Sequence, residues 1–240
     1  MTMQDYEQMI RANIAEIRAR MDAAAIAAGR QPGEVQLCAA TKMNDAERVR
    51  AAIRGGVDLC GENRVQELQQ KQPSGAYEGA PIHFIGHLQS NKVKYVVGQV
   101  DVIQSVDRVA LLEAIDAQAR KKGVRQQVLL EVNIGGEASK SGFTPEETRQ
   151  IVEQMGRFPG VLVQGLMAIP PVSTKKGENL RYFAEMRQLF IDISQKKYDN
   201  VSMVCLSMGM SDDFEDAISC GSTMIRIGTA IFGARDYTKK

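Results

Sequence analysis

Short apolar runs alternate with amphipathic or polar segments along most of this chain. Residues 4–28 come first and carry apolar side chains at helical spacing up to Gly29, which predicts a leading helix. Eight short, nearly continuous apolar runs follow, and each predicts a buried strand. They span residues 35–42, 57–63, 82–86, 100–107, 126–134, 161–169, 201–208 and 223–228.

A helical or turn-like segment follows each apolar run. The expected helices are 44–54, 64–71, 88–97, 108–121, 145–155, 178–195 and 212–221, and a short turn at 229–234 ends the series. Eight such units predict an α/β fold, a (β/α)8 or TIM barrel with an extra N-terminal helix. An open doubly wound sheet is the alternative, but it usually carries G-x-G-x-x-G where this chain has Thr41-Lys42. No linker or shift in composition divides the sequence, so we expect one domain over residues 1–240.

Composition and charge exclude several classes of protein. The chain has 30 basic and 29 acidic residues and a net charge of +1, which argues against nucleic-acid or membrane-surface partners. It has no apolar run of the ~20 residues that span a bilayer, and its acid-containing start is unlike a signal peptide. The cysteines are isolated, and His83 and His87 have no acidic neighbour in sequence, so no metal site is expected. We expect a cytoplasmic protein.

The stretch VNIGGEASKSGF, residues 132–143, resembles the phosphate-binding P-loop G-x-x-x-x-G-K-S/T. A serine follows Lys140, as that pattern requires, but Ile134 and Ser139 occupy the two glycine positions. A P-loop helix begins at the lysine, whereas Thr144, followed by proline, predicts a later start. We therefore interpret the stretch as the fifth strand with its loop, and not as a nucleotide site.

Polar residues end several predicted strands, on the face where barrels carry their chemistry. Lys42 ends the first strand, where partial burial would lower the pKa of its amine and make it a candidate to form a Schiff base. A solvated rim lysine is the alternative. The loops after strands seven and eight are small and glycine-bearing, as in many barrels that bind phosphate there. These loops supply Ser207, Gly209, Gly228 and Thr229.

A reactive lysine and a phosphate site on one rim suggest pyridoxal phosphate (PLP), whose aldehyde and phosphate lie on different sides of its ring. Arg226, on strand eight, would then face the ring nitrogen. Because an arginine stays protonated at any working pH, that nitrogen would remain unprotonated and the ring would be a poor electron sink. A barrel that acts on phosphorylated sugars without a cofactor is the weaker alternative.

Eight stretches of the sequence carry a resemblance to a known family. They are ATK at 40–42, GENRVQE at 61–67, HFIGHLQSNK at 83–92, SVD at 105–107, VNIGGEASKSGF at 132–143, GLMAI at 165–169, LSMGMSDDFEDAI at 206–218 and RIGTAIFG at 226–233. With them the chain resembles, over nearly its whole length, the pyridoxal phosphate homeostasis proteins, which are single-domain relatives of the alanine racemase barrel. One departure is Arg64, which stands where an aromatic residue is common.

The resemblance implies a fold-type III barrel with PLP held on Lys42 as an internal aldimine. It also implies that Asn63 lies beside the ring and that Arg226 faces the ring nitrogen. The phosphate would be held by Ser207, Gly228 and Thr229.

The function that the resemblance implies is the buffering and delivery of PLP, with effects on amino-acid and keto-acid balance and without catalytic turnover. Racemases of this barrel type use a tyrosine from a second domain of the partner chain as another acid/base. This chain ends at Lys240, and its six tyrosines fall away from the predicted strand ends. We therefore expect a monomeric, non-catalytic PLP-binding protein whose transient acceptors are PLP-dependent enzymes that lack the cofactor.

Two alternatives stay open at this point. One is a racemase-like amino-acid enzyme, in which His87 or a water would act as the second acid or base. The other concerns Lys140, which is either a transient contact for incoming cofactor or an exposed loop lysine.

Overall fold

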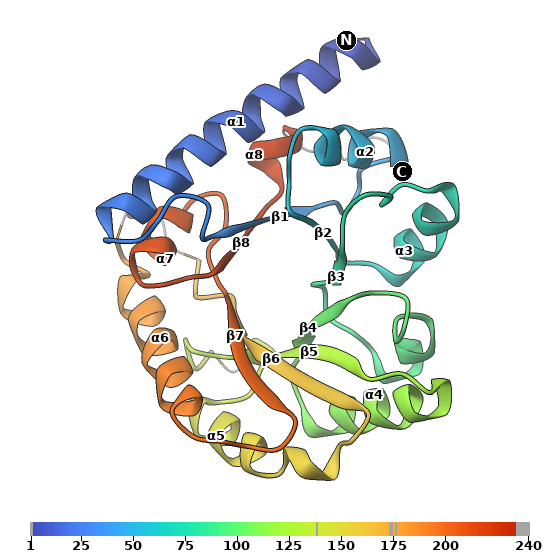
Figure 1. Cartoon of the computed structure of the whole chain (residues 1–240), viewed down its shortest axis with the longest axis vertical. Coiled ribbons are helices and arrows are strands. Elements are labelled where there is room, and N and C mark those ends of the chain that lie inside the picture. Colours follow the sequence, from blue (N-terminus) through green and yellow to red (C-terminus); the bar gives the residue numbers. More distant parts are fainter. Residues whose placement is uncertain (1, 138, 173–174, 176, 234–240) are drawn as a thin grey trace.

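Eight parallel strands close into a barrel in the computed structural model of the chain (Figure 1). The structure describes residues 2–137, 139–172, 175 and 177–233. The strands are β1 Gln36–Ala40, β2 Leu59–Glu62, β3 Ile82–Phe84, β4 Val102–Val106, β5 Gln126–Val132, β6 Val161–Ala168, β7 Val201–Ser207 and β8 Met224–Ile227. Each pairs with its neighbours in chain order, and β8 pairs with β1. The predicted barrel is confirmed, with strands up to two residues shorter at either end than the apolar runs.

Helices surround the barrel (Figure 1). They are α1 Met3–Ala27, α2 Ala46–Arg54, α3 Val65–Lys71, α4 Val109–Lys122, α5 Pro145–Glu153, α6 Leu180–Ser194, α7 Phe214–Ser219 and α8 Thr229–Phe232, with short 3₁₀ helices η1 Gln72–Ser74, η2 Ser90–Tyr95 and η3 Met155–Arg157. The α-helix expected over 88–97 is wrong, because the structure has only η2 there. That segment carries three stiff, β-branched valines, and all three are buried against neighbouring elements.

Two layers of apolar side chains fill the molecule, one inside the barrel and one between the strands and the helices. The interior layer includes Cys38, Leu59, Ile85, Val102, Leu129, Met167 and Met224. Larger clusters join the opposite strand faces to the helices. Because successive side chains of a strand alternate in direction, every second residue after an interior side chain also faces inward. This alternation directs Glu131, Ser207 and Arg226 to the barrel interior or its mouth. Lys42 and Asn63 follow just beyond the ends of β1 and β2.

Helix α1 crosses the outside of the barrel beside α2, α7 and α8 (Figure 1). Its buried face includes Ile10 and Ile14, which pack in one cluster with residues of α7, β8 and α8. The side chain of Asn13 donates a hydrogen bond to the Ile231 carbonyl at 2.9 Å, and the hydroxyl of Tyr6 donates to the Phe232 carbonyl. The leading helix therefore holds α8, the helix that follows the last strand.

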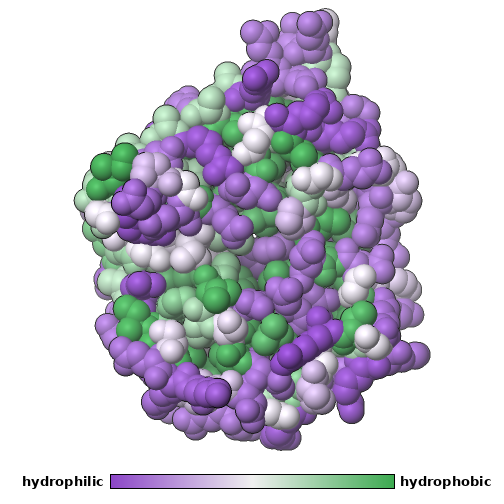
Figure 2. All heavy atoms as spheres, viewed as in Figure 1, coloured by the Kyte–Doolittle hydropathy of each residue, from purple (hydrophilic) through white to green (hydrophobic). Residues whose placement is uncertain are grey.

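The surface seen in Figure 2 is largely hydrophilic, with apolar side chains in small groups. Within the described ranges, no helix is long and apolar enough to cross a membrane.

Replacing Ile14 with alanine tests how much α1 contributes to the stability of the barrel. Ile14 is 1% exposed, and its Cδ1 packs so closely on Gly55 that a Cβ added there would lie 2.7 Å away. The cavity left by Ile14→Ala should lower the free energy of unfolding in urea by about 2–5 kcal/mol. Ile26→Ala, on the same helix but 60% exposed, is the control and should stay within about 0.5 kcal/mol of wild type. Equal effects of the two substitutions would contradict this packing.

Candidate functional site

Arg226 is a buried cation at the carboxyl ends of the strands. Its guanidinium donates to the Ser207 hydroxyl on β7 at 2.6 Å and to the Ala168 carbonyl on β6 at 2.9 Å, so the side chain crosses from β8 to β6. Arg226 is 6% exposed, and burial lowers the pKa of its guanidinium. The guanidinium still carries its charge, because arginine does not lose its proton in proteins. The structure thus brings two predicted site residues, Arg226 and Ser207, into direct contact.

A chain of buried polar side chains continues from Arg226 into the barrel. The Ser207 hydroxyl donates to Gln104 Oε1 at 2.7 Å, and Gln104 Nε2 lies 2.8 Å from His83 Nδ1. Burial lowers the pKa of His83 to about 4, so its ring is neutral and Nδ1 accepts a hydrogen bond from the Gln104 amide. This chain fixes the orientation of Arg226 from below. Sequence analysis missed Gln104, although a glutamine two residues after an interior-facing valine of a strand was the available signal.

Asn63 follows β2 and faces the mouth with one side-chain atom unsatisfied. Its Oδ1 is buried and has no hydrogen-bond partner among the described residues. A Cβ added at Gly86, after β3, would lie 2.1 Å from the Asn63 carbonyl oxygen, so the two backbones are in close contact. A buried, unsatisfied oxygen is costly unless a further group binds it. Asn63 therefore has the properties of a ligand-binding residue.

Lys42 lies in the turn that connects β1 to α2 and is half-buried. A network beneath it holds the preceding residue: Thr41 donates to Glu62 at 3.2 Å, and Lys71 donates to the Thr41 carbonyl at 2.9 Å. Glu62 is fully buried and bound to Lys71 at 2.9 Å. Glu62, next to Asn63 in sequence, does not face the mouth, because alternation along β2 turns it outward beneath α3.

Two glycine-bearing loops, which the sequence predicts to hold phosphate, follow β7 and β8. Gly209 has a φ of +98°, and a Cβ there would lie 2.7 Å from the Ala217 side chain, so this close approach requires glycine. Gly228 precedes α8, and Thr229 is its first residue. The first N–H groups of a helix have no partner within the helix. Ala39 and Ile227 are the last opposite pair in the β1–β8 register, so the N–H groups that follow β8 start from the same end of the barrel as the turn that carries Lys42.

The loop from Asn133 to Phe143 is tied to the end of β5 and is not a P-loop. The Asn133 N–H donates to the Phe143 carbonyl at 2.9 Å, and the Asn133 side chain donates to two carbonyls within the loop. Helix α5 begins at Pro145 with Thr144 as its N-cap, as predicted. Asn133 Oδ1, like that of Asn63, is buried without a partner among the described residues.

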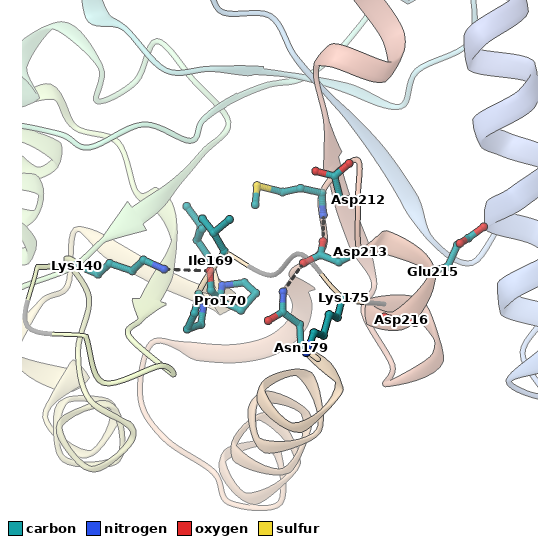
Figure 3. Close-up of a pocket in the computed structure, with 12 residues that line it drawn as sticks. Lys140, Ile169, Pro170, Lys175, Asn179, Asp212, Asp213, Glu215 and Asp216 are labelled. Atoms are coloured by element: carbon teal, nitrogen blue, oxygen red, sulfur yellow. Dashed lines mark hydrogen bonds between the residues drawn. The ribbon is translucent and has the colours of Figure 1, made fainter. Parts of the chain in front are cut away.

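Lys140 lies beside a pocket of about 530 Å³ and is not a fully exposed loop residue. Its amine donates to the Pro170 carbonyl at 3.1 Å and forms an ion pair with Glu137. Figure 3 shows Lys140 directed at Pro170 from one side, with Asp213 bound to Asn179 on another. The pocket is lined by Lys140, Ile169, Pro170, Pro171, Val172, Lys175, Asn179, Met210, Asp212, Asp213, Glu215 and Asp216.

Further acidic groups lie at the ends of β4 and β5. Asp107 Oδ2 lies 3.1 Å from His87 Nδ1, a pairing that spacing along the sequence did not reveal, and Asp107 also forms an ion pair with Arg108. Glu131, which sequence analysis also missed, faces inward on β5. Burial, and then the negative charge of Asp107, raise the pKa of Glu131 to about 7, while Arg226 opposes the shift. Within the described residues, no group of three or more His, Cys, Asp and Glu side chains could hold a metal ion.

The fold and this polar mouth define a barrel of the alanine racemase class, and the family model "Alanine racemase, N-terminal domain" matches residues 7–236. The chain is 41% identical over 225 residues to the pyridoxal phosphate homeostasis protein of Pseudomonas aeruginosa. The aligned region covers 94% of this chain and 95% of that protein. It is 39% identical over 232 residues to the protein of the same name from Escherichia coli, with 95% and 97% covered. The chain therefore belongs to the pyridoxal phosphate homeostasis protein family, as the sequence motifs indicated.

The chain is also similar to a solved structure that contains PLP. PipY of Synechococcus elongatus, determined with PLP bound, superposes with a TM-score of 0.79 at 32% identity and covers 93% of this chain and 100% of its own.

The raised pKa of Glu131 predicts a pH-dependent stability. Native Glu131 keeps its proton up to about pH 7, whereas the unfolded chain releases it near pH 4.3. The native state therefore binds the extra proton, and stability is lost as pH rises through this window. Glu131→Gln, which resembles the protonated form, should gain stability relative to wild type between pH 4.5 and 8, by up to about 3 kcal/mol. Urea unfolding of the cofactor-free proteins measures this gain, and a difference that does not change with pH would contradict it.

Proposed function

We propose that this barrel binds PLP reversibly at its mouth and serves in the intracellular homeostasis of that cofactor. The observation that carries the proposal is the convergence of three groups on neighbouring strand ends: the amine of Lys42, the buried cation of Arg226, and the N–H groups at Gly228-Thr229. PLP offers an aldehyde, a ring nitrogen and a phosphate, one for each group. The relatives that share this barrel bear the name of that activity, and PipY has been determined with PLP bound.

The residues at the mouth fit PLP in their chemistry. Lys42 would hold the aldehyde carbon, Arg226 would face the ring nitrogen, and Asn63 would offer its unsatisfied Oδ1 to the ring or its substituents. Gly209, Gly228 and Thr229 would surround the phosphate with N–H groups and a hydroxyl. When bound, PLP supplies an electrophilic aldehyde and a ring that delocalises charge.

Ser207 takes a different part in this proposal from the one its sequence position suggested. Its hydroxyl proton is donated to Gln104, and its oxygen accepts from Arg226. We therefore assign Ser207 to the positioning of Arg226, and its contact with the phosphate stays a prediction.

The proposed activity is cofactor binding and transfer without turnover. The Arg226 guanidinium keeps its protons and cannot give one to the ring nitrogen, which leaves the ring a weak electron sink. We propose a cytoplasmic monomer that exchanges PLP with enzymes lacking the cofactor.

Covalent trapping tests the role of Lys42. Borohydride reduction of the PLP-loaded protein should fix the cofactor on the peptide that contains Lys42, as read by mass spectrometry, because only an imine is reduced to a stable amine. Lys42→Ala should abolish that label. Lys140→Ala is the matched control and should keep the label and the rates of loading and release, since the Lys140 amine is already bound to Pro170 and Glu137. A label on another lysine in the wild-type protein would contradict the assignment.

Isotope exchange tests the absence of turnover. The paired His87 and Asp107 are the observation that favours a racemase-like alternative, because a histidine oriented by a carboxylate can carry a proton. We expect no deuterium at the α-carbon when the PLP-loaded protein is incubated with single amino acids in deuterated water and the products are examined by NMR. Incorporation that His87→Ala abolishes would establish the racemase-like activity instead.

A further inference from the structure

The turn that carries Lys42 contains an unfavourable backbone conformation. Met43, the next residue, has a φ of +62°, in the left-handed region that glycine and asparagine adopt readily and other residues rarely do. Among the described residues, the only other non-glycine with positive φ is Asn200, for which this conformation is common. An unfavourable conformation persists only where the surroundings enforce it.

Two side chains of α3, Glu67 and Lys71, bind the backbone of this turn. Glu67 Oε2 accepts a hydrogen bond from the Met43 N–H at 2.8 Å. Lys71 donates to the Thr41 carbonyl at 2.9 Å and to the same Glu67 oxygen at 2.7 Å. Glu67 and Lys71 are four residues apart and therefore lie on one face of the helix. Together they fix the backbone groups immediately before and after Lys42.

Burial makes this arrangement rigid. Lys71 is 8% exposed and is also bound to the fully buried Glu62 at 2.9 Å. That carboxylate accepts further hydrogen bonds from the Tyr77 hydroxyl at 3.0 Å and from the Asn63 N–H at 2.7 Å. Apolar side chains of similar volume stabilise a core as well as a buried ion pair does. What the charged groups add is direction, because the hydrogen bonds from Lys71 to the Thr41 carbonyl and from the Met43 N–H to Glu67 each fix one backbone atom.

We propose that Glu67 and Lys71 form a positioning clamp that enforces the left-handed turn at Met43 and so holds Lys42 where its amine reaches the aldehyde of PLP. This inference rests on the proposed function for its covalent step. Glu67 and Lys71 do not touch the cofactor, and they act through the backbone of the turn.

Substitutions at Glu67 separate covalent capture from non-covalent binding. Borohydride trapping at successive times measures capture, and PLP binding in a Lys42→Ala background measures non-covalent affinity. Glu67→Ala should slow capture by about tenfold or more, because small misplacement of a reacting group has large effects on rate, and it should leave the non-covalent affinity within about twofold of its parent. Glu67→Gln, which keeps an acceptor, should restore most of the rate. Gln70→Ala, at an exposed position of α3, is the matched control and should capture PLP as wild type does.

Substitutions at Met43 show whether the left-handed turn transmits the effect. Glycine adopts positive φ without steric cost, so Met43→Gly should return capture by Glu67→Ala to within about threefold of wild type. Met43→Val, with a β-branched side chain disfavoured at positive φ, should slow capture in the otherwise wild-type protein. Met43→Val, measured in the otherwise wild-type protein, decides the matter if Glu67→Ala does not fold. The clamp would be overturned if Glu67→Ala and Met43→Val captured PLP at the wild-type rate. It would also be overturned if Glu67→Ala lost as much non-covalent affinity as capture rate, or if Met43→Gly did not restore capture by Glu67→Ala.

A readout without PLP distinguishes failure of the clamp from failure of the proposed function. In the cofactor-free protein, the Met43 amide should be protected from hydrogen exchange, and its ¹³C shifts should report the left-handed conformation. Both signatures should be lost in Glu67→Ala and kept in Gln70→Ala. If the wild-type protein traps no PLP while these signatures behave as stated, the cofactor proposal is wrong and the clamp stands. Unchanged signatures in Glu67→Ala would overturn the clamp itself.

Discussion

The buried positive charge of Arg226 is the constraint around which the mouth of this barrel is organised. A guanidinium is costly to remove from water unless its N–H groups are hydrogen-bonded. Here Ser207 and the Ala168 carbonyl bind it, and Gln104 with His83 hold Ser207 from below. A barrel core does not need such a chain for stability, because well-packed apolar side chains serve equally well. The chain instead presents a cation of fixed orientation beside the strand ends.

A second polar network lies on the outer side of the same strands. Glu62 faces α3, whereas its neighbour Asn63 faces the mouth. The end of β2 therefore contributes one residue to the outer network and one to the candidate site. The outer network fixes the backbone around Lys42, and the inner one fixes Arg226. The backbone around Lys42 and the side chain of Arg226 are therefore held by separate sets of hydrogen bonds, at the ends of the paired strands β1 and β8.

Much of this arrangement could be predicted from the sequence, and the reason is periodicity. Continuous apolar runs revealed the eight strands, and the residues that end them included Lys42, Asn63 and Arg226, because a barrel gathers its strand ends on one face. The motifs also indicated the family. Which of these side chains contact PLP stays a prediction, since their spatial convergence does not by itself show a bond.

The rest depended on packing that the sequence does not display. The sequence of residues 88–97 is compatible with an α-helix, but the segment buries three valines and forms only a short 3₁₀ helix. His87 and Asp107 are partners across two strands, which spacing along the chain conceals. Glu131 has no distinguishing feature in the sequence, because its raised pKa depends on its burial near Asp107 and Arg226.

In the proposed site, Lys42 binds the aldehyde carbon of PLP and Arg226 binds the ring nitrogen on the opposite side of the ring. A crystal structure of the protein grown with PLP tests it most directly. The account predicts continuous density from the Lys42 Nζ to the aldehyde carbon, the ring nitrogen within hydrogen-bonding distance of the Arg226 guanidinium, and the phosphate at Gly228-Thr229. PLP bound through another lysine, or a ring turned so that its nitrogen faces away from Arg226, would contradict it.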